Sequence, residues 1–156
     1  MLSKQDFYDV VKKTPLVAVD FIIINENNEI LLGKRNNAPA KGEFFTFGAV
    51  IAKNETIEQA KKRVLKNELG IILKKSDFIN TMGIFEQFYN NNFKDSKTNT
   101  HYIVLSFLMK INSNRIKVNK KEHIAFEWFD QDDVIKSKTI NKNVKALLKF
   151  KKTNEK

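Results

Sequence analysis

The fold is decided by residues 47–71, FGAVIAKNETIEQAKKRVLKNELGI, where a glycine-containing apolar segment gives way to a charged one. Thr56 and Gln59 have the spacing of a capping box, in which each side chain accepts a hydrogen bond from the backbone of the other residue. The pattern therefore predicts a helix over residues 56–69 with Thr56 as its N-cap.

One carboxylate lies on the side of this helix that should be apolar. At 100° per residue, Ala60 and Val64 fall within about 60° of Ile57, so these three residues predict the buried stripe. Glu68 lies about 20° from Ile57, inside that stripe. A desolvated carboxylate needs a cation or strong donors, so Glu68 either pairs locally with partial solvent access or belongs to a functional site. Arg63 stands at the edge of the stripe, and its planar fork suits a carboxylate or a phosphate.

The rest of the chain alternates apolar segments with polar turns. Helices are expected at residues 3–12 and twice after residue 129, and strands at residues 14–25, 30–35, 44–51, 79–89, 101–111 and 125–129. The first two strands read as a hairpin. Strands on both sides of a central helix, joined mostly by hairpins, predict one α+β domain around a mixed β-sheet.

The bulk composition fits a globular enzyme or binding module. The chain has 156 residues, of which 42% are hydrophobic and 29% charged. It has no cysteine, which excludes disulfides and thiolate metal sites. No apolar run approaches the roughly 18 residues of a membrane span, and the N-terminal pattern is that of an amphipathic helix rather than a signal peptide. We therefore expect a cytoplasmic protein without membrane contacts.

The net charge of +10 is concentrated at the C-terminus, where residues 136–156 hold eight lysines and one glutamate. A helical stripe runs through this segment: Ile140, Val144, Leu147 and Leu148. The favoured interpretation is a basic terminal helix packed by its stripe, with the lysines in solvent. The alternative is contact with nucleic acid or with a membrane surface.

At the opening stretch the sequence resembles the Nudix box. That pattern is Gly, five residues, Glu, seven residues, then Arg-Glu-aliphatic-any-Glu-Glu-any-Gly-aliphatic. The matching positions are Glu55, Arg63, Leu65, Glu68, Gly70 and Ile71. The positions that differ are Ala49, Val64 and Asn67. Two acidic positions are thus missing, which argues against an ordinary Nudix pyrophosphatase.

A wider resemblance points to the branch of GDP-mannose mannosyl hydrolases, which lack the same acids. It runs from near residue 2 to about residue 130 and includes KTPLVAVDF, LLGKR, AKGEFF, KNET, ELG, QFYNNNF, THYIVL and EHIAFEW. The resemblance implies one Nudix-like domain over residues 1–156, an αβα sandwich with a mixed sheet. It also implies a homodimer in which the N-terminal helix, residues 1–13, helps to complete the nucleotide site.

The resemblance implies hydrolysis of GDP-mannose or GDP-glucose to GDP and free sugar. Water attacks the anomeric carbon with inversion, so the site needs a base, cations for the leaving diphosphate and a held nucleotide. His123 matches the general base, a role that its near-neutral ordinary pKa suits. His101, the second histidine of the chain, begins an apolar strand and is expected to be structural.

The remaining site residues are also carried over from the resemblance. Glu68, the Gly48 carbonyl and Glu122, which replaces a glutamine, match the ligands of one Mg²⁺ or Mn²⁺ ion, for which oxygen donors are suited. The other matches are Arg35 and Arg63 beside the diphosphate, Asp20 near the sugar or leaving group, Phe7 near the guanine and Tyr102 near the phosphates.

Three departures leave other functions open. Val50 stands where the family has an arginine facing the diphosphate, Glu122 adds a negative charge beside the metal, and Gln87 replaces a histidine. Loss of one charge-assisted contact costs on the order of 2–4 kcal/mol in the transition state. The alternatives are a catalytically impaired module that binds nucleotide or RNA, and a pyrophosphatase acting on another nucleotide-diphosphate substrate.

Overall fold

The structure is a computed structural model and describes residues 2–121 and 123–154. Its helices are α1 (Lys4–Lys13), α2 (Ile57–Leu69), α3 (Gln131–Lys136) and α4 (Lys142–Asn154), with a 3₁₀ turn, η1 (Ser113–Arg115). Its strands are β1 (Leu16–Ile24), β2 (Ile30–Arg35), β3 (Phe44–Phe45), β4 (Phe47–Val50), β5 (Ile79–Tyr89), β6 (Thr100–Lys110) and β7 (His123–Phe129).

One mixed sheet contains all the strands of the described residues, and β1 is its centre. β1 runs parallel to β6 along its whole length and antiparallel to β4 on its other side. The predicted hairpin of β1 with β2 has the right direction but is short, because their register joins only Ile24 and Ile30. β2 instead pairs with β3 and β7, and β5 lies beyond β6.

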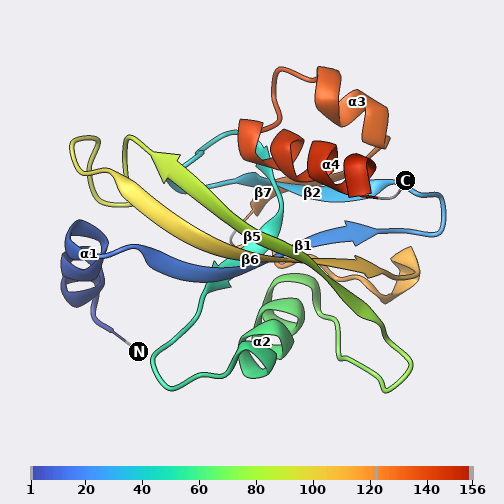
Figure 1. The fold of residues 1–156 in the computed structure, drawn as a ribbon, viewed down its shortest axis with the longest axis horizontal. Coiled ribbons are helices and arrows are strands. Elements are labelled where there is room, and N and C mark those ends of the chain that lie inside the picture. The colour runs from blue at the N-terminus through green and yellow to red at the C-terminus, as the bar shows by residue number, and fades with distance from the viewer. Residues whose placement is uncertain (1, 122, 155–156) are drawn as a thin grey trace.

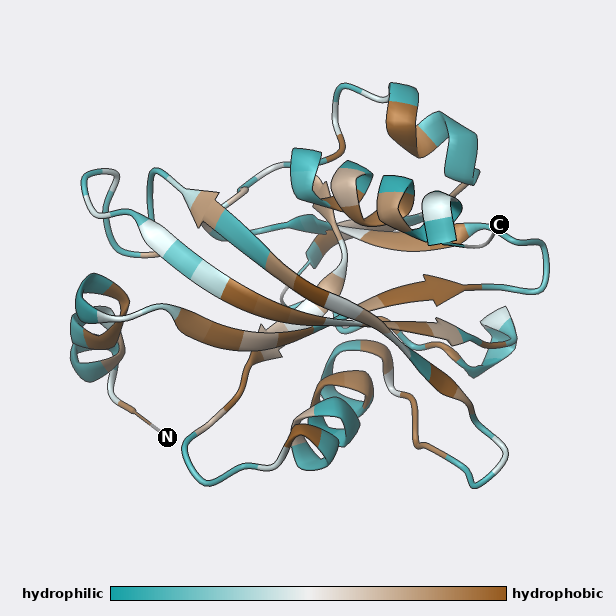
Figure 2. Ribbon diagram, viewed as in Figure 1, coloured by the Kyte–Doolittle hydropathy of each residue, from teal (hydrophilic) through white to brown (hydrophobic). Residues whose placement is uncertain are grey.

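The sheet lies between two helical layers (Figure 1). α2 covers one face, and α3 with α4 covers the other. Figure 2 shows hydrophobic residues along the strands and hydrophilic ones on the outer sides of these helices. This arrangement confirms the predicted α+β class and the αβα sandwich.

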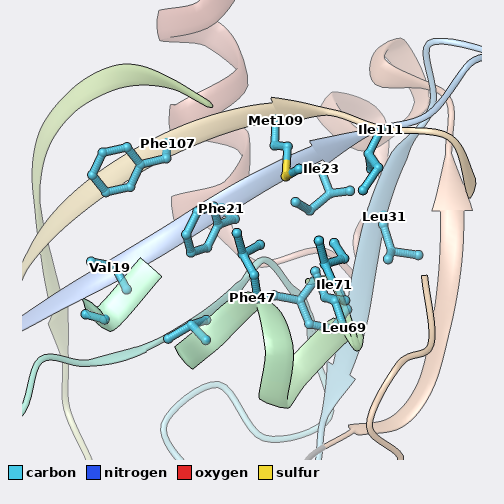
Figure 3. Packing of buried hydrophobic residues seen from close by; sticks show 13 residues of the cluster. Val19, Phe21, Ile23, Leu31, Phe47, Leu69, Ile71, Phe107, Met109 and Ile111 are labelled. Atoms are coloured by element: carbon cyan, nitrogen blue, oxygen red, sulfur yellow. The ribbon is translucent and has the colours of Figure 1, made fainter. Parts of the chain in front are cut away.

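Alternate residues of β1 face opposite sides of the sheet, as the period of two of a strand requires. Val19, Phe21 and Ile23 join the core under α2 (Figure 3), whereas Ile22 and Ile24 join the core under α4. Both cores are fully buried at these positions. The even-numbered positions of β1 therefore face the α4 side.

The start of α2 agrees with the sequence, and its buried arc is shifted. Thr56 is the N-cap, and both hydrogen bonds of the capping box with Gln59 are present. Ile57 is 46% exposed, so its place in the predicted stripe is wrong. Ile57 is the first residue of the helix, and the buried side begins one turn later and includes Lys61. The Lys61 amino group contacts Glu58 and the Phe107 ring. The full buried set is Ala60, Lys61, Val64, Leu65 and Leu69.

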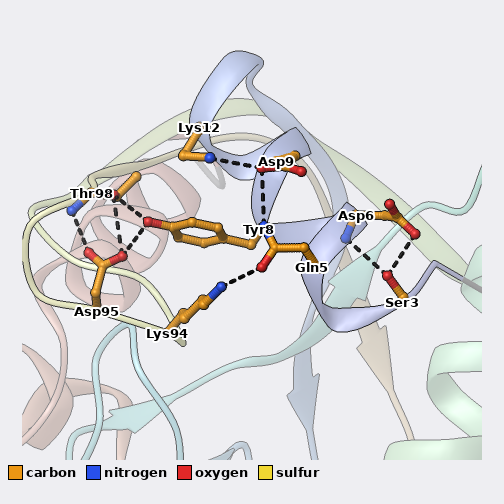
Figure 4. Close-up of polar contacts among 9 residues, drawn as sticks. All are labelled: Ser3, Gln5, Asp6, Tyr8, Asp9, Lys12, Lys94, Asp95 and Thr98. Atoms are coloured by element: carbon orange, nitrogen blue, oxygen red, sulfur yellow. Dashed lines mark hydrogen bonds and ion pairs between the residues drawn. The ribbon is translucent and has the colours of Figure 1, made fainter.

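α1 docks on the loop between β5 and β6 (Figure 4). Tyr8 donates a hydrogen bond to Asp95 and contacts Thr98, and Lys94 bonds Gln5. Phe7 packs on Phe93 with ring centroids 5.5 Å apart. The N-terminal helix is thus fixed to its own chain at the far end of the β5–β6 hairpin.

The apolar stripe of the basic C-terminal segment packs as predicted, but one of its lysines, Lys151, is buried and bonds Gln131 instead of lying in solvent. It is α4 from Lys142 onward, and residues 137–141 connect it to α3. The stripe of Ile140, Val144, Leu147 and Leu148 is buried in the core under α4. No helix of the described residues is long and apolar enough to cross a membrane.

Candidate functional site

A cavity of about 170 Å³ opens on the α4 side of β1, β4, β5 and β6. Its walls combine apolar strand residues with a few polar groups that converge on one space, which is typical of a ligand site. The residues around it are Ala18, Val19, Asp20, Arg35, Pro39, Phe45, Thr46, Gly48, Ala49, Val50, Gln87, Tyr89, Tyr102 and Val104.

Asp20 is a buried carboxyl in the wall of this cavity, because its even position on β1 turns it to the α4 side. Its Oδ2 accepts a hydrogen bond of 2.7 Å from Thr46 Oγ1, and its Oδ1 accepts one of 2.9 Å from the Phe21 backbone. Burial raises the pKa of Asp20 to about 6, although both donors and the charge of Arg35 act in the opposite direction. Asp20 is therefore fixed in place, with a pKa well above the ordinary value of 3.8.

Arg35 presents a free edge of its guanidinium to the same cavity. It ends β2, and its Nε donates to the Pro39 carbonyl at 2.9 Å and to the Asn37 carbonyl at 3.4 Å. Its guanidinium lies 5.8 Å from the centroid of the Phe45 ring. No hydrogen bond within the described residues uses its two Nη atoms, so they are available to an anion.

Two carbonyl groups of β4 point away from β1. Ile51 donates to the Val17 carbonyl at 2.8 Å, so in this antiparallel pair every second position is hydrogen-bonded. Gly48 and Val50 occupy the alternate positions, and their backbone groups face the opposite edge. The Val50 carbonyl accepts a hydrogen bond of 2.9 Å from Arg63 Nη2, which agrees with this direction. The Gly48 carbonyl is thus placed on the edge of β4 that meets α2.

Arg63 is occupied by protein groups. Its Nε and Nη2 contact the two carboxylate oxygens of Glu55 at 2.6 and 2.8 Å, besides the bond to Val50. This pairing holds the pKa of Glu55 at about 2, below its ordinary value of 4.5. Arg63 therefore ties the loop before α2 to the end of β4, and its predicted place beside a diphosphate stays a prediction.

Glu68 and His123 meet on the α2 side of the sheet. His123 Nε2 lies 3.0 Å from Glu68 Oε2, and the two side chains are 5% and 15% exposed. The His123 ring packs on Phe47 with centroids 4.7 Å apart. It also needs Gly33, because a Cβ there would lie 2.4 Å from His123 Nδ1. That Nδ1 is buried and has no hydrogen-bond partner.

The predicted site residues fall into two groups on opposite sides of the sheet. Asp20, Arg35, Gly48 and Tyr102 line the cavity, whereas Glu68 and His123 form the pair under α2. Phe7 belongs to neither group in its own chain, and Glu122 lies outside the described residues. Within the described residues no cluster of three or more His, Cys, Asp or Glu side chains is placed to hold a metal. A metal here would depend mainly on Glu68 and backbone oxygen.

The sequence reasoning missed two polar residues of the cavity. Thr46 fixes Asp20, and its signal was a hydroxyl within the apolar run FFTF. Tyr89 lies across from Tyr102 with ring centroids 6.0 Å apart, and burial raises its pKa. Its signal was its two-residue spacing from Gln87, which puts both side chains on one face of β5.

The family model of the NUDIX domain matches residues 14–150 of this chain. The low-salt glycan biosynthesis protein Agl8 of Haloferax volcanii is 34% identical over 121 residues, which cover 78% of this chain and 74% of that protein. An ADP-ribose pyrophosphatase of Methanocaldococcus jannaschii is 33% identical over 122 residues, which cover 78% of this chain and 66% of that protein.

Solved structures share the fold. The MutT protein of Methanosarcina mazei superposes with a TM-score of 0.72 at 19% identity, covering 92% of this chain and 99% of that chain. The NUDIX domain of Shewanella oneidensis NrtR, solved with ADP ribose, gives 0.69 at 15% identity, covering 99% and 100%. With the capped helix α2, the Glu55–Arg63 pair and the family match over residues 14–150, the chain belongs to the NUDIX domain family of hydrolases.

Proposed function

We propose that this NUDIX-family protein hydrolyses a GDP-sugar, GDP-mannose or GDP-glucose, to GDP and the free sugar. Water attacks the anomeric carbon with inversion, and the diphosphate leaves. The observation that carries the proposal is the contact of His123 with Glu68. It joins the candidate base to the carboxylate of α2 that the sequence analysis identified as a possible site residue.

The contact fixes the tautomer that a base requires. When Glu68 accepts a hydrogen bond from His123 Nε2, the neutral ring carries its lone pair on Nδ1. Nδ1 is buried and has no partner among the described residues, so a water molecule or substrate group that reached it would meet an unused acceptor. Glu68 then acts as the orienting group behind the base, a common arrangement in general-base catalysis.

The cavity supplies the groups that hold the substrate. The open edge of Arg35 pairs with the diphosphate, and the Tyr102 hydroxyl lies in the same wall. In this proposal Asp20, with a pKa of about 6, holds or gives a proton near the leaving oxygen or binds a sugar hydroxyl. These groups stabilise the charge that develops when the anomeric bond breaks.

A divalent ion fits the donor chemistry of the α2 edge. The Glu68 carboxylate and the outward Gly48 carbonyl are oxygen ligands of the kind that Mg²⁺ prefers, and Mn²⁺ accepts the same set. The diphosphate and water would complete the coordination of one ion. Bound there, the ion would neutralise charge on the leaving diphosphate. Glu122, the third predicted ligand, is part of this proposal only.

Two further observations favour sugar release over pyrophosphate cleavage. The Nudix pattern has lost two acids here, at Val64 and Asn67, so α2 retains a single candidate carboxylate ligand. The relative Agl8 is named for glycan biosynthesis, a process that uses activated sugars. Both fit a nucleotide-sugar substrate.

A pyrophosphatase is the second candidate, because a relative named ADP-ribose pyrophosphatase is 33% identical to this chain. Such an enzyme would cut between the phosphates and leave the anomeric bond intact. The third candidate, a binding module for nucleotide or RNA, is favoured by the net charge of +10.

One experiment separates the three candidates. The protein is incubated with GDP-mannose and Mg²⁺, and the products are identified by chromatography and NMR. GDP with free mannose, first seen as the inverted anomer, supports the proposal. GMP with mannose 1-phosphate overturns it in favour of the pyrophosphatase. No turnover at high protein concentration, with nucleotide or RNA retained, supports the binding module.

The homodimer belongs to the same proposal. Phe7 lies on Phe93 at the tip of the β5–β6 hairpin, away from its own cavity, so it would serve the nucleotide site of a second copy. Sedimentation equilibrium tests this assembly. A protein that is active as a monomer would contradict it.

A further inference from the structure

Gln87 is a buried amide in the wall of the cavity. It is 5% exposed and lies on β5 opposite Tyr102 of β6. Its odd position on β5 turns it to the α4 side, as it does Tyr89. A buried amide requires partners for both its oxygen and its nitrogen. The orientation of the amide therefore shows which of the two atoms is left for a ligand.

A chain of hydrogen bonds from α4 fixes that direction. Asn143, in the first turn of α4, donates from Nδ2 to the Tyr89 hydroxyl at 2.9 Å. Tyr89 donates that hydroxyl proton to Gln87 Oε1 at 3.0 Å. Burial raises the pKa of Tyr89, which keeps its hydroxyl protonated and therefore able to donate. The oxygen of Gln87 is thus committed to the protein.

The nitrogen of Gln87 remains available. No hydrogen bond within the described residues uses its Nε2. This nitrogen is not among the unpaired polar atoms that are sealed from solvent, so it is accessible. Since Gln87 lines the cavity, the NH₂ group is a donor that a ligand would satisfy. An unsatisfied buried donor costs about 1–3 kcal/mol, so a ligand oxygen that meets it gains affinity.

We propose that Gln87 is a specificity-determining residue that donates a hydrogen bond to an uncharged oxygen of the nucleotide sugar, and that Tyr89 and Asn143 are the positioning residues that aim it. The inference rests on the proposed function for the substrate class. Its site is separate from the His123–Glu68 pair.

An uncharged acceptor suits this end of the cavity better than a phosphate does. The diphosphate already has the Arg35 fork, which is charged and bidentate, whereas Gln87 offers a single neutral donor. Asp20 and Arg35 come from β1 and β2, while Gln87 comes from β5 across β6. A base carbonyl or a sugar hydroxyl supplies the acceptor, and the two sources are separable by ligand choice.

The test measures binding, so it does not depend on turnover. In a His123→Gln background, calorimetry with Mg²⁺ compares GDP and GDP-mannose. Gln87→Met removes the amide at nearly constant volume, and Gln87→Glu replaces the donor by an acceptor. We expect about tenfold weaker binding for the first variant and a larger loss for the second. Gln59→Glu, at the exposed start of α2 where it preserves the capping box, is the matched control with unchanged affinity.

The ligand pair identifies the source of the oxygen. Equal loss for GDP and GDP-mannose assigns the contact to the nucleoside diphosphate part, and loss confined to GDP-mannose assigns it to the mannose. Tyr89→Phe keeps the ring against Tyr102 but breaks the chain, and we expect it to weaken the same ligand about threefold or more. Affinity unchanged in both Gln87 variants overturns the inference. A failure of sugar release with these affinity changes present would overturn only the proposed reaction.

Discussion

Glu68 and His123 stand 55 residues apart in sequence, and their side chains meet at 3.0 Å where the last turn of α2 faces the first residue of β7. A carboxylate on the buried side of a helix needs a hydrogen-bond donor, and the imidazole of His123 supplies one to Glu68. It also leaves a single unpartnered nitrogen on the histidine.

Replacing His123 by glutamine tests the proposed base. The amide retains a hydrogen bond to Glu68 but takes up no proton, so sugar release should fall by about 10²–10⁴-fold while the fold persists. The rate of GDP formation from GDP-mannose is the measurement. His101→Gln is the matched control: His101 stacks on Phe88 with ring centroids 4.3 Å apart, outside the cavity, and its loss should leave the rate unchanged. An unchanged rate in His123→Gln would show that the base is another group.

Glu68→Gln tests the metal ligand. The amide oxygen still contacts His123, but the negative charge that a divalent ion needs is gone. We expect Mn²⁺ binding, followed by electron paramagnetic resonance, to weaken by tenfold or more, and activity to require correspondingly more Mg²⁺. Glu58→Gln removes an exposed carboxylate of the same helix and should change neither quantity. Equal metal binding by the unmodified protein, Glu68→Gln and Glu58→Gln would show that Glu68 is not a metal ligand.

The sequence predicted the parts of this site that depend on local pattern. The capping box placed the start of α2 correctly, because Thr56 and Gln59 satisfy each other within one turn. Angular position also placed Glu68 correctly, since the buried arc of α2 extends on both sides of it. The same rule failed for Ile57, the first residue of α2, since a helical wheel gives only angular position and does not show that the end of a helix is exposed.

Contacts across the sheet were beyond the sequence pattern. Pairing of β1 with β6 follows from long-range register, so nothing local foretold that Gln87 and Asp20 share a cavity. Arg63 was only partly resolved by the pattern. Its planar fork predicted a carboxylate or phosphate partner, and the structure pairs it with the carboxylate of Glu55, eight residues away in the chain.

Glu55→Gln tests the structural clamp on β4. An acid whose pKa is lowered by folding stabilises the native state above its unfolded pKa, and this contribution disappears as the pH falls toward the folded pKa. For Glu55 the window runs from 4.5 down to about 2. Since Arg63 is 36% exposed, screening reduces the effect, and we expect a loss of about 1 kcal/mol in unfolding free energy at pH 7 that shrinks toward pH 2.

A second clamp provides the control for this prediction. Asp77 pairs with Arg115 at 2.6 Å, also has a pKa of about 2, and lies outside the cavity. Denaturant titrations of Asp77→Asn and Glu55→Gln across this pH range should show similar losses of stability. Only Glu55→Gln should also slow sugar release, because only it loosens β4. Equal activity in the two variants would show that the Glu55–Arg63 pair does not affect the reaction.

Asp20→Asn should make the protein more stable and less active. Folding raises the pKa of Asp20 from 3.8 to about 6, so its contribution is fully present below 3.8 and is lost as the pH rises through 6. Above that pH the native state buries a charge, and removing it should raise the unfolding free energy by about 1–3 kcal/mol. The gain should vanish below pH 3.8. Thermal unfolding at pH 4 and pH 8 measures it, and a gain equal at both values would contradict the buried charge.

Val50→Arg should restore a cation that the cavity lacks. The Val50 side chain lies in the same wall as Arg35, and a guanidinium there would reach the leaving diphosphate. One added charge-assisted contact to the transition state is worth on the order of 1–3 kcal/mol, so we expect sugar release to rise by tenfold or more. Val17→Arg adds the same charge at a 44% exposed position of β1 whose side chain faces the opposite side of the sheet, and it should leave kcat unchanged. A similar gain in both variants would reflect net charge, and a loss in Val50→Arg would place the leaving group elsewhere in the cavity.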